Sequence, residues 1–134
     1  GVDWLALSAK EPRVGRVTKV GPPSGGRVTA ISLDTRQEHW RRDMDSVEHA
    51  RWPGEEVGDP VGSGIAVANG VAYFTTVMGH KLLAVDTSSG QVLCTRELPG
   101  VWSGPSVSRG RVYVGSGRIF TEQKPQGGVF CFGL

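Results

Sequence analysis

The chain has 134 residues, 38% of them hydrophobic, and a formal net charge of +2. A charge this close to neutral argues against a broad binding surface for nucleic acid or acidic membranes. No apolar run approaches the roughly 18 residues of a transmembrane helix, so no membrane span is expected. The 20 glycines and 8 prolines suit many short strands joined by turns.

The N-terminal part, residues 1–42, is predicted to form an antiparallel unit of three strands. Its opening residues align with Gly70–Thr76 further along the chain, which makes them the first of the three strands. The second and third strands are expected at 27–33 (RVTAISL) and 37–42 (QEHWRR), with a turn between them at 34–36. A long Pro/Gly-rich loop is expected before them, at 8–26.

A polar segment, residues 43–62, follows and is rich in carboxylates. It is expected to be a loop, in which only Val47–Trp52 (VEHARW) has a pattern compatible with a helical turn.

Residues 63–100 contain four short apolar segments, each of strand length, separated by turn signals. Asn69-Gly70 is the dipeptide that closes two-residue hairpins, and Asp86–Gly90 combines side chains that bond a turn backbone with a glycine. The expected strands are Ile65–Ala68, Val71–Val77, Lys81–Val85 and Gln91–Glu97.

The remaining residues, 101–134, repeat this unit. Gly110 and Tyr113 each lie 40 positions after Gly70 and Tyr73, and SGPSVSRGRVYV aligns without a gap on SGIAVANGVAYF. A β pattern with a repeat of about 40 residues is typical of propeller blades. The predicted fold class is therefore all-β, a propeller of four-stranded antiparallel blades.

The repeat resembles the pyrroloquinoline-quinone (PQQ) repeat propellers, quinoprotein alcohol dehydrogenase-like proteins. Arg111–Gly117 (RVYVGSG) is similar to the second strand of their blade, and Leu82–Gly90 (LLAVDTSSG) is similar to the third strand and its turn. Trp40 stands where this family places a tryptophan that docks each blade on the next. In the complete unit Cys94 takes that place, which is expected to loosen the contact.

The resemblance implies about two and a half blades from the C-terminal part of a larger propeller. The expected partial propeller domain spans 1–134: an incomplete blade at 1–42, an interblade loop at 43–62, a complete blade at 63–100 and an incomplete last blade at 101–134. Another polypeptide, copies of the chain or a removed portion is expected to supply the other blades, since a propeller closes with about four or more.

Two functions are compatible with this repeat. One is a dehydrogenase that oxidises an alcohol with PQQ and Ca²⁺; the other is a cofactor-free scaffold that binds proteins, as in the lipoprotein of outer-membrane-protein assembly that shares the repeat. Either implies a periplasmic or secreted protein. No c-type haem is expected, because the chain has no C-x-x-C-H motif.

Strand direction places the three long insertions, residues 8–26, 43–62 and 118–127, on one face of the blades. Links between second and third strands and links between blades meet there, whereas the tight turns meet on the opposite face. We call these the loop-bearing face and the short-turn face. Binding sites usually occupy loops on a rigid scaffold, so the loop-bearing face is the predicted binding face.

Candidate site residues were chosen on this face by their chemistry. Tryptophan can stack on a planar quinone, arginine can pair with its carboxylates, and carboxylate oxygens suit Ca²⁺. The candidates for cofactor binding are Trp52, Trp102, Arg41, Arg42 and His80; those for metal binding are Asp43, Asp45, Glu55, Glu56 and Asp59. The structural alternatives are packing between blades for the tryptophans and pairing of Arg41-Arg42 with Asp43 and Asp45.

The two cysteines, Cys94 and Cys131, fall in strands of successive blades. A disulfide needs Cα atoms within about 7 Å, which strands of different blades rarely satisfy. Both are therefore predicted to be free thiols.

Overall fold

The structure, a computed structural model, describes the backbone of residues 2–7 and all atoms of 26–48, 53–117 and 127–133. All secondary structure within these ranges is β. The strands are β1 (Val2–Leu7), β2 (Arg27–Ser32), β3 (Glu38–Asp43), β4 (Ser46–Glu48), β5 (Glu56–Gly58), β6 (Ala66–Ala68), β7 (Val71–Thr75), β8 (Lys81–Asp86), β9 (Val92–Glu97), β10 (Ser106–Ser108), β11 (Arg111–Ser116) and β12 (Gly128–Gly133).

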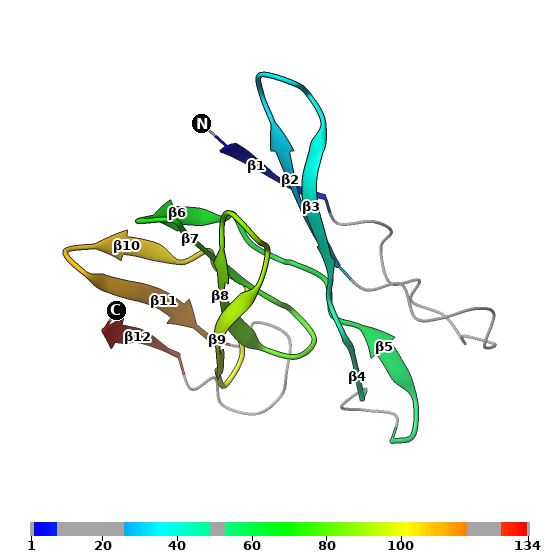
Figure 1. The fold of residues 1–134 in the computed structure, drawn as a ribbon. Helices are drawn as coiled ribbons and strands as arrows, with labels where there is room; N and C mark the ends of the chain where they lie inside the picture. Colours follow the sequence, from blue (N-terminus) through cyan, green and yellow to red (C-terminus); the bar gives the residue numbers. More distant parts are fainter. Residues whose placement is uncertain (1, 8–25, 49–52, 118–126, 134) are drawn as a thin grey trace.

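The strands form three antiparallel sheets that follow the chain, and one separate hairpin (Figure 1). We call β1-β2-β3 the first blade, β6-β7-β8-β9 the second blade and β10-β11-β12 the third blade. Each is a simple meander in which every strand pairs with its neighbour in sequence. The predicted fold class and the order of three, four and three strands are confirmed for the described residues.

The second blade lies between the other two and contributes one apolar face to each contact. Phe74 and Val85 pack with Val28 of the first blade in one buried cluster. Tyr73 packs with Val112 of the third blade in another. Tyr73 and Phe74 are neighbours in β7, and successive residues of a strand point to opposite faces of the sheet. The apolar run in β7 therefore shows that both faces of the second blade are buried.

The tight turns have the backbone that their sequences require. Asn69 and Gly70 have φ of 50° and 75°, and Arg109 and Gly110 have φ of 48° and 70°. Two successive positive φ values define the turn type that suits a two-residue hairpin. The 40-residue repeat is thus present in the pairing as well, since Ala66 pairs with Tyr73 and Ser106 with Tyr113.

A β-bulge recurs at the same point of the first two blades. Ala30 pairs with Trp40 and the register shifts before Ile31 pairs with Glu38. The extra residue puts Glu38 on the face of the sheet that also carries Arg41 and Asp43. In the second blade the shift follows the pair of Ala84 and Cys94. The two bulges identify Cys94 as the structural equivalent of Trp40.

The interblade segment contains a hairpin that we did not predict. Ser46 pairs with Gly58 and Glu48 with Glu56, forming β4 and β5. Figure 1 shows this hairpin at the end of the first blade opposite its β2–β3 turn. The expected helical turn is wrong for Val47 and Glu48, which are in β4; the rest of that segment, residues 49–52, lies outside the described residues.

The turn between β8 and β9 is held by one carboxylate. Asp86 Oδ1 accepts hydrogen bonds from the backbone N–H groups of Ser88 and Ser89, at 2.9 and 2.8 Å, and from both of their hydroxyls. These bonds favour the ionised form and lower the pKa of Asp86 from 3.8 to about 2, chiefly through the Ser88 and Ser89 side chains.

Acid should therefore weaken the fold through this turn. Because the pKa of Asp86 is lower in the folded chain, its stabilising effect is complete above its unfolded value of 3.8 and is lost as the pH falls towards 2. Asp86→Asn should remove that dependence. We expect the wild-type denaturation midpoint to fall relative to that of the variant within this pH window, and two parallel curves would contradict the assignment.

Candidate functional site at the junction of the first and second blades

The first blade docks on the second through Trp40. Its indole ring lies over Gly90, where a Cβ atom would come within 2.6 Å of the ring, and its Nε1 donates to the Thr87 carbonyl at 2.9 Å. The ring also packs against the apolar cluster between the blades. The docking role expected for Trp40 is confirmed.

Arg42 reinforces the same contact. Its Nε donates to the Gly90 carbonyl at 2.6 Å. Trp40 and Arg42 are two positions apart in β3 and so share the face that meets the second blade. Between them they bind the backbone of one turn, Asp86–Gly90.

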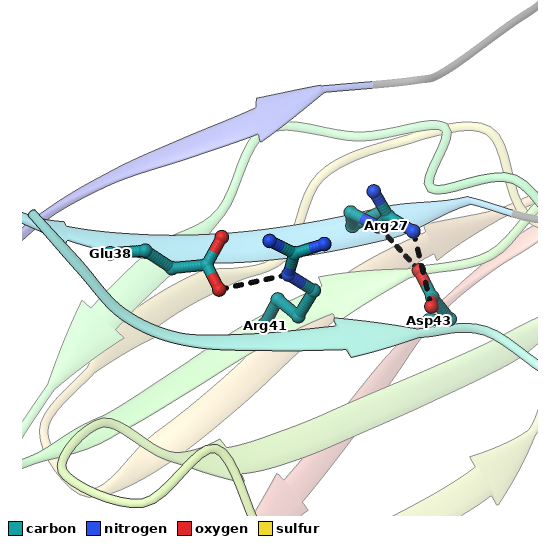
Figure 2. A network of polar contacts seen from close by, with 4 residues as sticks. All are labelled: Arg27, Glu38, Arg41 and Asp43. Carbon is teal, nitrogen blue, oxygen red and sulfur yellow. Dashed lines mark hydrogen bonds and ion pairs between the residues drawn. The ribbon is translucent and has the colours of Figure 1, made fainter.

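The opposite face of the first blade carries an exposed charge network, shown in Figure 2. Arg27 donates through both Nε and Nη2 to the carboxylate of Asp43, its register partner across β2 and β3; the Nη2–Oδ2 distance is 3.2 Å. Arg41 donates from Nε to Glu38 at 2.8 Å. The hydrogen bond from Arg27 lowers the pKa of Asp43, and the bond to Glu38 raises the pKa of Arg41.

This network corrects the expected pairing of Arg41 and Arg42 with Asp43 and Asp45. Adjacent residues of a strand point to opposite faces, which separates Arg42 from Asp43. Asp43 is instead engaged from across the sheet by Arg27, and the bulge brings Glu38 to Arg41.

Asp59 anchors the interblade segment. It is 2% exposed, and its Oδ1 accepts from the backbone N–H groups of Met78 and Gly79, at 3.0 and 2.8 Å. The Asp59 carbonyl also accepts from the N–H of Gly26 at 3.3 Å, at the start of β2. One buried residue thus joins the link between β7 and β8 to the first blade.

Removing this anchor should destabilise the chain. Asp59→Ala leaves two backbone N–H groups without their charged acceptor, and we expect the free energy of unfolding to fall by about 2–3 kcal/mol. Asp59→Asn keeps an oxygen in place and should cost clearly less. Denaturant unfolding measures both; an alanine variant as stable as the wild type would show that the anchor is unimportant.

A cavity of about 240 Å³ lies at this junction, on the loop-bearing face. We call it the junction cavity. Its lining comprises Arg42, Asp43, Met44, Asp45, Asp59, Thr76, Lys81, Leu83, Val92 and Thr95. The carboxylate of Asp43 is bonded to Arg27 on the opposite face of the first blade. Four candidate site residues chosen from the sequence therefore do meet: Arg42, Asp43, Asp45 and Asp59.

The other candidates lie elsewhere. Trp102 precedes β10 and is 57% exposed. His80 precedes β8, and its backbone carbonyl accepts a hydrogen bond from the N–H of Leu98 at 2.8 Å. Glu55 and Glu56 are exposed at the β4–β5 hairpin, where Glu56 accepts from the Ser46 hydroxyl at 3.2 Å. Trp52 lies outside the described residues, and Arg41 is in the charge network of Figure 2.

Lys81 and Thr76 are lining residues that sequence reasoning missed. A signal was available for Lys81, since it is the first residue of the third strand in its blade and so lies at the loop-bearing face. Thr76 is less obvious, because it falls within the predicted strand Val71–Val77, whereas in the structure it follows β7 and bridges to Val61.

Within the described ranges, no three His, Cys, Asp or Glu side chains are grouped so that they could hold a metal ion. The same ranges contain no helix long and apolar enough to cross a membrane. Cys94 and Cys131 are both free, as predicted; Cys94 is half-buried and Cys131 is exposed.

Antiparallel meanders stacked face to face, with a tryptophan of one blade seated on a turn glycine of the next, define a β-propeller of PQQ-repeat type. The family model described as outer membrane protein assembly factor BamB matches residues 24–126, and the chain belongs to this family.

Among solved structures, the crystal structure of BamB from Moraxella catarrhalis is similar to the chain, with a TM-score of 0.48 and 15% identity. The match covers 97% of this chain, which spans 39% of the length of that protein. No curated protein matches the chain.

Proposed function

We propose that this chain is part of a cofactor-free propeller scaffold that binds protein partners during outer-membrane-protein assembly, in the periplasm. The family description supports this role. The observation that carries it is that Arg42 and Asp59, two of the charged residues expected to bind a cofactor or metal, are engaged where the first and second blades meet instead.

Three of these engagements are direct. Arg42 is bonded to the Gly90 carbonyl, Asp43 to Arg27, and Asp59 to the amides of Met78 and Gly79. Freeing Arg42 or Asp59 for a ligand would break a contact made where the first and second blades meet.

The size of the junction cavity supports the same reading. Its volume of about 240 Å³ is below the range of about 300–1,000 Å³ typical of sites for small molecules. A cavity of this size is small for PQQ with Ca²⁺, which supports the cofactor-free proposal. The PQQ-dependent dehydrogenase is the alternative proposal, favoured by the presence of Arg42, Lys81, Asp45 and Asp59 in the lining of one cavity.

A protein partner should contact the loop-bearing face, where the β4–β5 hairpin presents exposed carboxylates. The test is the affinity of the complete protein for a fluorescently labelled, unfolded outer-membrane β-barrel protein, measured by anisotropy. We expect Glu55→Lys with Glu56→Lys to change the affinity by about tenfold or more.

Asp34→Lys is the matched control, since Asp34 is exposed in the β2–β3 turn on the short-turn face. It should leave the affinity unchanged. Absence of measurable binding by the wild type, or an equal effect of the control, would contradict the proposal.

A further inference from the structure

Lys81 contributes to the junction cavity a charge that no ion pair of the described residues uses. It is half-buried and is the first residue of β8. Its register partner in β9 is the carboxylate residue Glu97, but the two make no ion pair within the described part of the chain. The equivalent pair of the first blade, Arg27 and Asp43, does form one. Lys81 thus lines the cavity without an ion pair across its own sheet.

Arg42 supplies a second cation to the cavity. Its Nε donates to the Gly90 carbonyl, and its two Nη groups make no hydrogen bond or ion pair with the residues that the structure describes. A guanidinium carries five N–H donors, of which this contact uses one. A ligand in the cavity can therefore bind Arg42 while the bond to Gly90 is kept.

The carboxylates of the cavity are mostly engaged with other groups. Asp43 is bonded to Arg27 on the opposite face of the first blade, and Asp59 accepts from two backbone amides. Asp45 is exposed and makes no ion pair among the described residues. The cavity therefore has more cationic donors than available carboxylates. A half-buried ammonium in such a place is stabilised by an anion, because desolvation without a partner is costly.

The size and apolar part of the cavity limit the form of that anion. Met44, Leu83 and Val92 are in the lining, and the volume is about 240 Å³. This is less than most small-molecule sites provide but leaves space for one side chain. A short aliphatic stem can contact the apolar residues while a terminal carboxylate reaches the cationic groups.

We infer that the junction cavity binds the side chain of a glutamate or aspartate of a protein partner, whose carboxylate pairs with Lys81 and with the Nη groups of Arg42. The inference depends on the proposed scaffold function and names the group of the partner that is recognised at this site. It differs from a contact with the exposed Glu55 and Glu56 of the β4–β5 hairpin, which attract cationic groups.

The test compares two forms of the labelled, unfolded outer-membrane β-barrel protein of the anisotropy assay, added to the complete protein. In one form the carboxylates are amidated with methylamine. We expect amidation to weaken binding by about tenfold or more. Contact through the acidic hairpin alone predicts the opposite, since amidation makes the probe more cationic. Unchanged or tighter binding of the amidated form would overturn the inference.

Variants of one register pair locate the effect. Lys81→Met should weaken binding of the unmodified β-barrel protein by about tenfold and remove the difference between the two forms. Lys81→Arg keeps the charge and should keep most of the affinity. Glu97→Gln is the matched control, since Glu97 is directly opposite Lys81, and it should not weaken binding.

The structural alternative is that Lys81 only balances carboxylates of its own chain. A Cβ at Gly79 would meet both Asp59 Oδ2 and Lys81 Cε, so the stem of Lys81 passes close to Asp59. Under this alternative, amidation of the probe has no effect that depends on Lys81. Equal losses of affinity in Lys81→Met and Glu97→Gln would likewise contradict the inference.

The outcome separates this inference from the proposed function. If both forms of the β-barrel protein bind equally, the scaffold role stands and this inference alone is wrong. If neither form binds, the scaffold proposal fails and the inference fails with it.

Discussion

Gly90→Ala is expected to lower the free energy of unfolding by about 3 kcal/mol. Gly90 has a φ of 72°, where an L-residue is strained by roughly 1–2 kcal/mol. The added Cβ would also lie 2.6 Å from the Trp40 ring, and such overpacking typically costs about 1–3 kcal/mol. Denaturant unfolding at equilibrium measures the sum.

Gly110→Ala separates the two contributions. Gly110 has a φ of 70°, almost the same as Gly90, but a Cβ there would meet nothing within 4 Å. It should therefore show the backbone cost alone, roughly 1–2 kcal/mol. If both variants lost the same stability, the seating of Trp40 on Gly90 would contribute nothing, and the account of the first junction would be wrong.

Trp40→Ala should be the most destabilising single truncation at this junction, costing about 3–4 kcal/mol. It removes the ring from the interblade cluster and leaves the Thr87 carbonyl without its indole donor. Thermal or denaturant unfolding of the variant measures the loss.

Trp102→Ala is the comparison, because this side chain is 57% exposed. It should cost less than about 1 kcal/mol. A larger loss for Trp102 than for Trp40 would mean that the docking residue has been misidentified.

The blades were predictable because their signals are local. Asn69-Gly70 needs two left-handed residues, and the structure has both there. The alternation and spacing around Tyr73 and Tyr113 then set the register of two blades. A turn dipeptide and a repeat need no knowledge of distant contacts.

The charged residues were harder to place because their partners depend on register. Asp43 meets Arg27 because the two are opposite across β2 and β3, and Glu38 meets Arg41 because of a bulge that the sequence does not reveal. Asp59 was chosen for its carboxylate, but its partners are backbone amides, which any residue could have provided. The β4–β5 hairpin is short and polar, so it has neither the length nor the alternation of a predictable strand.

The most direct test of the account is the melting temperature, Tm, of the complete protein with and without PQQ and Ca²⁺. A ligand at 100 times its Kd adds about 2.7 kcal/mol to the stability of the protein that binds it, enough to raise Tm by a few degrees. The scaffold account predicts the same Tm in both conditions, because Arg42, Asp43 and Asp59 are engaged within and between the blades. A rise in Tm that requires both PQQ and Ca²⁺, and that Asp43→Asn reduces, would contradict it and favour the dehydrogenase.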